Sequence, residues 1–148
     1  MDGDMEGDKV LHESEVAVTR GDSTPSVILP LIVEEARKIR ASHGTFQAIG
    51  IGAPGQVEKD SGLVLQAPNL SHWVRVPLGS ELSRLTGVPV RVTNDVRAST
   101  LAEWKWGAGR GSRNLINVYL GTGIGGGIVL NGQLLEITHA QGKAHALV

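Results

Sequence analysis

The chain has 148 residues, 41% of them hydrophobic, which is enough for one domain with a packed core. Its formal net charge is −1 and its lysines and arginines are scattered, so the composition argues against nucleic acid as a partner. The absence of cysteine excludes thiol catalysis and cysteine-based metal sites, and it fits a reducing cytoplasm. No run of about eighteen apolar residues predicts a membrane span, and the acidic N-terminus does not resemble a secretory signal.

Helix-like and strand-like segments alternate along the chain after a start at 1–9 that we expect to be disordered or irregular. Periodicity and boundary residues predict strands at 10–18, 46–52, 88–93 and 114–120, and helices at 25–42, 77–86 and 96–106. The first helix has Ser23 or Thr24 as its N-cap and Gly44 beyond its end. Strands separated by helices predict a sheet with parallel pairs, covered by helices, in an α/β architecture.

Residues 115–127 form an apolar strand that runs into a loop with five glycines in seven positions. Glycine lacks a Cβ and tolerates positive φ, so successive backbone N–H groups can turn toward one anion. After the loop come a short apolar run, the turn signal Asn131-Gly132 and a second apolar run, which together predict a β-hairpin. The pattern favours phosphate binding by this loop, and its candidate residues are Gly121, Thr122, Gly123, Gly125 and Gly126.

Other interpretations compete with a phosphate loop. Gly121, Gly123 and Gly126 match the G-x-G-x-x-G spacing of dinucleotide-binding folds, but that fingerprint needs a helix directly after the glycines and an acidic residue further on. Here a strand is predicted after the glycines, and no acidic residue lies beyond Glu136. No Gly-Lys-Ser/Thr follows, which excludes a Walker A loop. A glycine-rich turn at a sheet edge, without any ligand, stays open as the alternative.

Asp95 is the strongest candidate for a catalytic side chain. In open α/β sheets, ligands gather at the carboxyl ends of strands, and the polar loops at 52–56, 94–95 and 121–127 fall at such ends. A carboxylate at a helix start is kept ionised by the helix dipole and can accept a hydroxyl proton, as phosphoryl transfer to an alcohol requires. The alternative is that Asn94 and Asp95 only cap the helix. A hydroxyl-activating acid and a phosphate loop at one sheet edge favour a kinase.

Several blocks of the sequence, in their order and spacing, resemble the ROK family of bacterial glucokinases, related sugar kinases and sugar-responsive repressors. The blocks are residues 50–55, 67–70 with Trp73, 76–78, 87–90, 94–95, 107–111 and 121–127. The resemblance extends over roughly residues 46–135 and is far more specific than a single motif.

The resemblance implies an actin-like ATPase, ribonuclease H-like fold, in which a mixed sheet is covered by helices and ATP, Mg²⁺ and a sugar lie between two lobes. It implies that Asp95 is the catalytic base toward a sugar hydroxyl and that the loop at 121–127 faces the phosphates of ATP. Glucose or a related hexose would be bound by Gly55, Gln56, Asn69, Asn94 and His145.

The chain departs from the family pattern at both ends. The family's first strand and its Asp-x-Gly-Gly-Thr loop have no match at 1–10, and most of the C-terminal lobe is absent, so we interpret the single domain at 1–148 as a truncated member. Residues 136–148 form an atypical tail, in which Gly142 stands where the family has a sugar-binding Glu. The family's zinc site needs downstream cysteines, so zinc is not expected and no metal ligand is assigned.

Two functions follow from these observations. The first is ATP-dependent phosphorylation of a hexose, although the missing first phosphate loop argues against a working kinase. The second is a non-catalytic sugar-binding or regulatory ROK module, although the absence of a preceding helix-turn-helix argues against a repressor. A missing first strand would leave a sheet edge open, and an open edge invites pairing with another chain, so we expect self-association.

Overall fold

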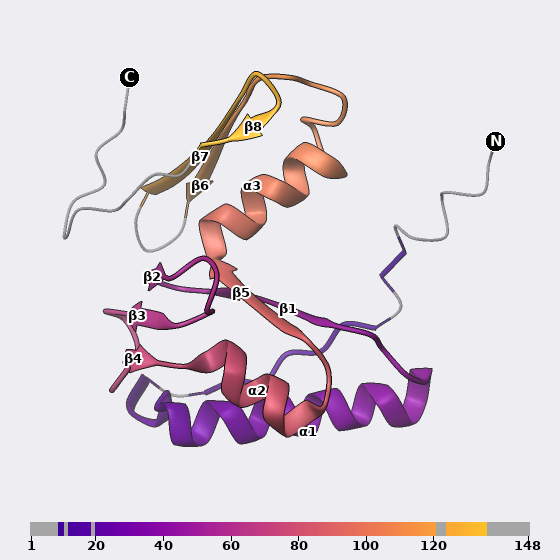
Figure 1. The fold of residues 1–148 in the computed structure, drawn as a ribbon, viewed down its shortest axis with the longest axis vertical. Helices are drawn as coiled ribbons and strands as arrows, with labels where there is room; N and C mark the ends of the chain where they lie inside the picture. Colours follow the sequence, from indigo (N-terminus) through magenta and orange to yellow (C-terminus); the bar gives the residue numbers. More distant parts are fainter. Residues whose placement is uncertain (1–8, 11, 19, 121–123, 136–148) are drawn as a thin grey trace.

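The computed structural model describes residues 9–10, 12–18, 20–120 and 124–135 (Figure 1). The expectations for residues 1–8 and for the tail at 136–148 lie outside this part of the chain. After the 3₁₀ helix Arg20–Asp22, the elements in chain order are α1 (Pro25–His43), β1 (Ile49–Ala53), β2 (Gln56–Val57), β3 (Val64–Gln66), β4 (Val74–Val76), α2 (Leu78–Thr86), β5 (Val90–Asn94), α3 (Asp95–Lys105), β6 (Leu115–Leu120), β7 (Ile124–Leu130) and β8 (Gln133–Leu134).

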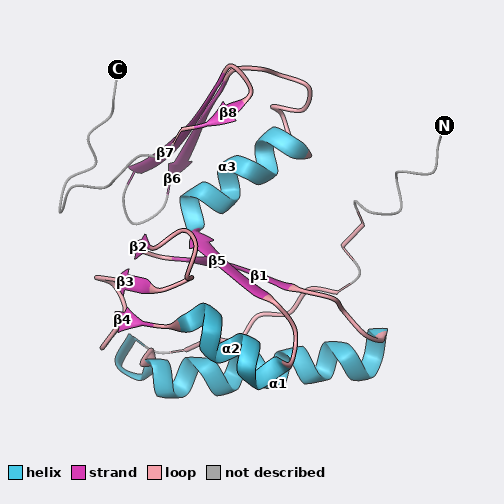
Figure 2. Ribbon diagram, in the orientation of Figure 1, coloured by secondary structure: helices cyan, strands magenta, loops and turns pink. Residues whose placement is uncertain are grey.

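The strands form three small sheets in the described ranges (Figure 2). β1 pairs with β5 in parallel, with Ile49 opposite Val90 and Ala53 opposite Asn94. β2, β3 and β4 form one antiparallel sheet, and β6, β7 and β8 form another. The predicted parallel pair is therefore confirmed. The remaining pairs are antiparallel because the chain reverses through short connections between them, whereas the connection from β1 to β5 includes α2 and is long enough for a crossover.

α3 lies between the two halves of the molecule in Figure 1. It contacts β1 and β5 on one side and β6 and β7 on the other. α1 and α2 pack against each other, and α2 also contacts β5. No helix in the described ranges is long and apolar enough to cross a membrane.

A cluster of buried side chains holds together the part of the molecule that lies below α3 in Figure 1. Its members come from both helices α1 and α2, from β1, β3, β4 and β5, and from the β3–β4 turn: Val33, Ala53, Val64, Ala67, Trp73, Val76, Leu78, Leu82 and Val92. The Trp73 indole is buried, and its Nε1 donates to the carbonyl of Ser23 at 2.6 Å, which satisfies its polar end. This bond ties the β3–β4 sheet to the start of α1.

The predicted helices are confirmed with small shifts of their ends. α1 begins at Pro25, since proline is favoured in the first helical turn, and Gly44 follows its end with φ +86°. Thr24 is the N-cap by position, but its hydroxyl pairs with Ser26 Oγ rather than with a free backbone N–H. Strands β2, β3 and β4 were not predicted from the sequence. They have only two or three residues each, which is too short to show an alternation of apolar and polar residues.

The predicted strand at 10–18 is wrong for the residues that the structure describes. Residues 9–10 and 12–18 have no regular structure and pair with no strand. Instead, the segment 12–18 lies along α1, where Ser14 Oγ donates to Glu35 Oε2 at 3.2 Å. A strand pattern in sequence becomes a strand only when a neighbour offers backbone donors and acceptors, and none does so here.

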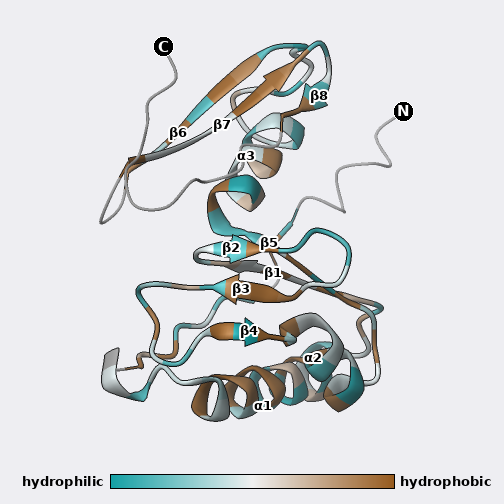
Figure 3. Cartoon of the chain, turned by 60° about the vertical axis from the view of Figure 1, so that its left-hand side comes forward, coloured by the Kyte–Doolittle hydropathy of each residue, from teal (hydrophilic) through white to brown (hydrophobic). Residues whose placement is uncertain are grey.

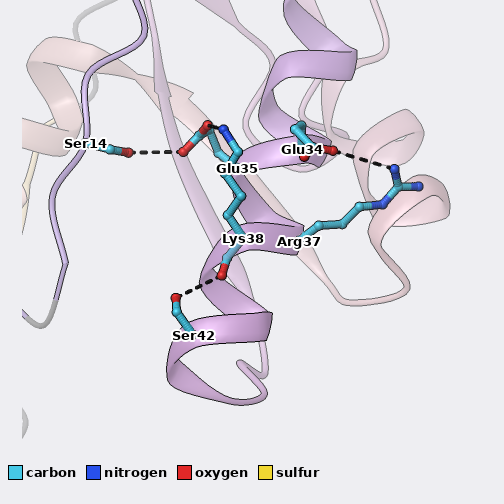
Figure 4. A network of polar contacts seen from close by, with 6 residues as sticks. All are labelled: Ser14, Glu34, Glu35, Arg37, Lys38 and Ser42. Atoms are coloured by element: carbon cyan, nitrogen blue, oxygen red, sulfur yellow. Dashed lines mark hydrogen bonds and ion pairs between the residues drawn. The ribbon is translucent and has the colours of Figure 1, made fainter.

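The Ser14 contact belongs to a polar network whose other members lie on α1 (Figure 4). Lys38 Nζ donates to Glu35 Oε1 at 2.7 Å, and Ser42 Oγ donates to the Lys38 carbonyl at 2.9 Å. The hydrogen bond from Lys38, together with that from Ser14, lowers the pKa of Glu35 below its ordinary value of 4.5. The same contact with Glu35 raises the pKa of Lys38.

An apolar cavity of about 500 Å³ lies between α1, the segment 12–18 and the start of β1. Its walls include Val16 and Val18 of the segment, Leu31 and Ile39 of α1, and Phe46 before β1, with Glu35 among the lining residues. The cavity is remote from the chain's polar strand ends, so its size does not mark it as the site of chemistry.

The face of β6 turned away from α3 is apolar and exposed. Ile116, Val118 and Leu120 alternate along this strand and are 74%, 60% and 76% exposed, and β6 is largely brown in Figure 3. The register places Ile128 and Ile124 of β7 opposite Ile116 and Leu120, which puts them on the same face. β6 also has an open edge among the described strands, because it pairs only with β7.

We predict that Glu35→Gln reduces stability at neutral pH but not in acid. Because the pKa of Glu35 is lowered in the folded state, its contribution is fully present above its unfolded value and is lost as the pH falls through the lowered one. In urea unfolding, the free energy of unfolding of the wild type should therefore exceed that of the variant at pH 7, and the two should be equal well below about pH 4. Glu34→Gln is the control, since Glu34 faces Arg37 at 3.8 Å on the same helix. Identical pH dependence in both variants would contradict the prediction.

Candidate functional site

The parallel pairing of β1 with β5 brings two predicted loops together. Ala53 at the end of β1 lies opposite Asn94 at the end of β5. The loop at 53–55 and the Asn94-Asp95 pair therefore leave the same edge of the sheet. The sequence-predicted candidates Gly55, Asn94 and Asp95 lie side by side at this edge.

Asn94 connects the two loops through three hydrogen bonds. Its Oδ1 accepts from the backbone N–H of Val96 at 3.0 Å and of Arg97 at 3.2 Å, so its side chain caps α3. Its Nδ2 donates to the carbonyl of Gly55 at 2.8 Å. The amide thus holds the Gly55 loop against the first turn of the helix.

Asp95 is the first residue of α3, and Asn94 rather than Asp95 is the N-cap. Asn94 therefore caps the helix, and Asp95 does not. Asp95 Oδ1 accepts from the N–H of Val96 at 2.9 Å, and Oδ2 has no hydrogen-bond partner in the described part of the chain. The helix N-terminus favours a negative charge here. Asp95 is half-buried.

Gly52 is a residue whose role the sequence did not reveal. A Cβ on Gly52 would lie 3.4 Å from both the Cα of Asp95 and the Cβ of Ala98. These are ordinary packing distances, and they show that the first turn of α3 lies on the end of β1 at Gly52. Its place in the block at 50–55 was visible in the sequence, but its contact with α3 was not.

Gly55 has a conformation and a packing that only glycine permits. Its φ is +84°, and a Cβ there would overlap the carbonyl oxygen of Gln66. Gln56 follows in β2, is half-buried, and pairs with Gln66. Asn69 is exposed on the turn after Ala67, which also contacts Gly55. The turn that carries Asn69 therefore begins beside the Gly55 loop.

The glycine-rich stretch lies between β6 and β7 in the chain, and the predicted hairpin around Asn131-Gly132 is confirmed as the pair β7 and β8. Gly121, Thr122 and Gly123 lie outside the described residues. Gly125 and Gly126 lie within β7. A Cβ on Gly125 would lie 3.0 Å from Val96 Cγ2, and a Cβ on Gly127 would overlap the Thr100 hydroxyl. Gly125 and Gly127 thus have a packing role against α3, which the phosphate interpretation did not anticipate.

These contacts place the start of β7 beside the first turn of α3. Gly125 is two residues beyond the 121–123 stretch, and it packs on Val96, the residue directly after Asp95. Asn117 Nδ2 further joins β6 to α3 through Thr100 Oγ1 at 3.1 Å. Thr100 is completely buried and donates to the Val96 carbonyl at 2.8 Å. β7 is therefore docked on the helix that begins with Asp95.

The remaining predicted site residue, His145, lies outside the described ranges. Within those ranges no group of three His, Asp or Glu side chains could hold a metal ion. The large apolar cavity does not include any of the predicted site residues.

Comparison with known proteins assigns this arrangement to a family. The sequence pattern of the ROK family matches residues 4–143. The chain belongs to the ROK family. Glucokinase from Thermotoga maritima is 46% identical over 87 residues, which cover 59% of this chain and 27% of that enzyme. The DNA-binding transcriptional repressor Mlc of Escherichia coli is 36% identical over 102 residues, which cover 64% of this chain and 25% of the repressor.

Solved ROK structures share the fold of this chain. A ROK family glucokinase from Streptomyces griseus, crystallised with glucose and AMPPNP, has a TM-score of 0.69 and 36% identity, and the match covers 76% of this chain and 36% of that one. The expected actin-like ATPase fold is therefore confirmed. This ROK chain spans about a third or less of the length of these three relatives.

We predict that Gly127→Ala destabilises the protein more than Gly50→Ala does. The new methyl group at 127 meets the buried Thr100 hydroxyl, whereas a Cβ at Gly50 has nothing within 4 Å. Overpacking of this kind costs about 1–3 kcal/mol, while Gly50→Ala should be neutral or slightly stabilising. Chemical denaturation of the two variants measures the difference. Equal stabilities would show that β7 is not docked on α3 through Gly127.

Proposed function

We propose that this ROK chain binds a hexose at the Asp95 edge of the sheet and carries the hydroxyl-activating part of an ATP-dependent sugar kinase. One observation carries the proposal: Asp95 stands at a helix N-terminus with one carboxylate oxygen unbonded to the described residues, between the Gly55 loop and the strand that follows the glycine-rich loop. Similarity to ROK glucokinases supports glucose or a related hexose as the substrate.

In this proposal Asp95 is the catalytic base. Its free oxygen accepts the proton of a sugar hydroxyl, the hydroxyl oxygen attacks the terminal phosphorus of ATP, and the bond from that phosphorus to the ADP oxygen breaks. The products are a sugar phosphate and ADP. Asn94, Gly55, Gln56, Asn69 and His145 are proposed as sugar contacts, because amides, an imidazole and backbone groups supply the paired donors and acceptors that a polyol needs.

ATP is proposed to bind at the glycine-rich loop. Because Gly125 and Gly127 pack on α3, we assign the phosphate contacts mainly to Gly121, Thr122 and Gly123, with Gly125 and Gly126 shaping the approach through their missing side chains. Mg²⁺ would arrive with the phosphates and supply charge neutralisation. Proteins commonly hold it through only one or two carboxylates besides phosphate and water, so the lack of an acidic cluster in the described ranges is compatible with it.

A second function is sugar sensing without turnover. The specific observation in its favour is the similarity to the repressor Mlc, which is 36% identical over 102 residues of the same region. A site that presents Asn94 and Asp95 to a polyol can bind it whether or not ATP is present. In this alternative the chain binds a hexose, and any nucleic-acid contact belongs to other parts of such a protein.

We predict that Asp95→Asn lowers phosphorylation of glucose by about a hundredfold or more while glucose binding changes little, because the amide keeps the shape but cannot take the proton. A coupled ADP assay over a panel of hexoses and isothermal titration with glucose measure the two effects. Asp60→Asn, at an exposed loop position, is the control. Glucose binding without turnover in the wild-type chain would favour the sensing function, and absence of both would reject the site.

We also propose that two copies of the chain associate through the exposed face and open edge of β6. Its alternating apolar side chains, Ile116, Val118 and Leu120, and its unpaired edge support this association. Light scattering coupled to size exclusion should give a mass above 15.6 kDa for the wild type. Val118→Lys should lower the measured mass toward that of the monomer. Val74→Lys, at a valine that is 66% exposed in another sheet, should not. A monomeric wild type at high concentration would refute the proposal.

A further inference from the structure

The Asn94 side chain has almost no hydrogen-bonding capacity left for a ligand. A side-chain amide has two acceptor lone pairs and two N–H donors. Both lone pairs of Oδ1 are taken by the N–H groups of Val96 and Arg97, and one N–H of Nδ2 is taken by the Gly55 carbonyl. One N–H donor remains. The residue that sequence reasoning treats as a sugar contact is therefore mainly occupied in holding protein to protein.

We propose that Asn94 is a positioning residue that pins the Gly55 loop to the first turn of α3, and so sets the width of the sugar site beside Asp95. This inference rests on the proposed function for its consequence, but not for the contact itself. The loop is contacted on its other side as well, because Gly55 lies against Gln66 and Ala67. Gly55 is thus held between the β3–β4 turn and α3.

Because both lone pairs of Asn94 Oδ1 are occupied, Asn94 and Asp95 can bind a hydroxyl in only one orientation of its proton. A sugar hydroxyl beside Asn94 can accept the one remaining N–H, but it cannot donate to this amide. The adjacent carboxylate of Asp95, whose Oδ2 is unbonded to the described residues, is then the acceptor left for the hydroxyl proton. Asn94 and Asp95 together would orient a hydroxyl so that its proton points to the base. A catalytic step by Asn94 itself is not required.

Two variants distinguish the bond from Asn94 to the Gly55 carbonyl from the capping of α3 by Asn94. Asn94→Asp keeps acceptor oxygens for Val96 and Arg97 but replaces the donor to Gly55 with a repelling oxygen. Asn94→Ser keeps one capping oxygen, removes the donor and adds no charge, so it controls for the second carboxylate beside Asp95. Asn131→Asp makes the same chemical change in the exposed turn between β7 and β8 and should have no effect at the site.

Amide hydrogen exchange on the full chain is the direct test. We expect exchange at residues 55–57 to be at least about tenfold faster in both Asn94 variants, while protection at Val96 and Arg97 is kept, most clearly in Asn94→Asp. In the same samples the dissociation constant for glucose, or KM for glucose where turnover is present, should rise at least about tenfold with KM for ATP unchanged.

The outcomes decide the inference separately from the proposed function. Unchanged exchange at 55–57 in both variants would overturn the pin, and so would equal loss of protection at 55–57 and at Val96 and Arg97, which would leave Asn94 as a cap only. A wild-type chain that binds no glucose would reject the proposed function, yet the exchange data would still confirm or refute the pin.

Discussion

The parallel pairing of β1 with β5 is the constraint on which the candidate site depends. It sets Ala53 opposite Asn94, so two loops that are separated by about forty residues leave the sheet at the same edge. Asn94 then makes this proximity a contact, since its amide bonds both the Gly55 carbonyl and the start of α3. The position of Asp95 follows from that arrangement, with the first turn of α3 packed on β1 at Gly52.

α3 connects the β1–β5 pair to the sheet formed by β6, β7 and β8, because it contacts strands of both. Its first turn lies on β1, and its Val96 and Thr100 side chains pack where β7 has glycines. Asn117 adds polar contacts from β6 to the same helix. Gly125 and Gly127 permit close docking of a strand on a helix, and the proposed phosphate contacts fall to Gly121, Thr122 and Gly123.

The apolar cavity and the exposed apolar face of β6 and β7 both lie away from the Asp95 edge. The cavity is lined by α1, the segment 12–18 and the approach to β1, and it has a nearly continuous apolar wall. The exposed face belongs to β6 and β7. Apolar surfaces of this kind report on packing and association, whereas the site is recognised by convergent polar groups at strand ends.

The sequence by itself determined the helices, the strand that ends at Asn94, the β7–β8 hairpin with its Asn131-Gly132 turn, and the family, because periodicity, caps and ordered motifs are local features. It also singled out Asp95 and Gly55. It misjudged residues 10–18, because a strand needs a partner, and it missed β2, β3 and β4, because strands so short show no period. Only the tertiary structure decided that Asn94 is the cap and the connection to Gly55, and that Gly125 and Gly127 serve packing. Those roles are set by which distant backbone and side-chain atoms come into contact, and no local pattern records them.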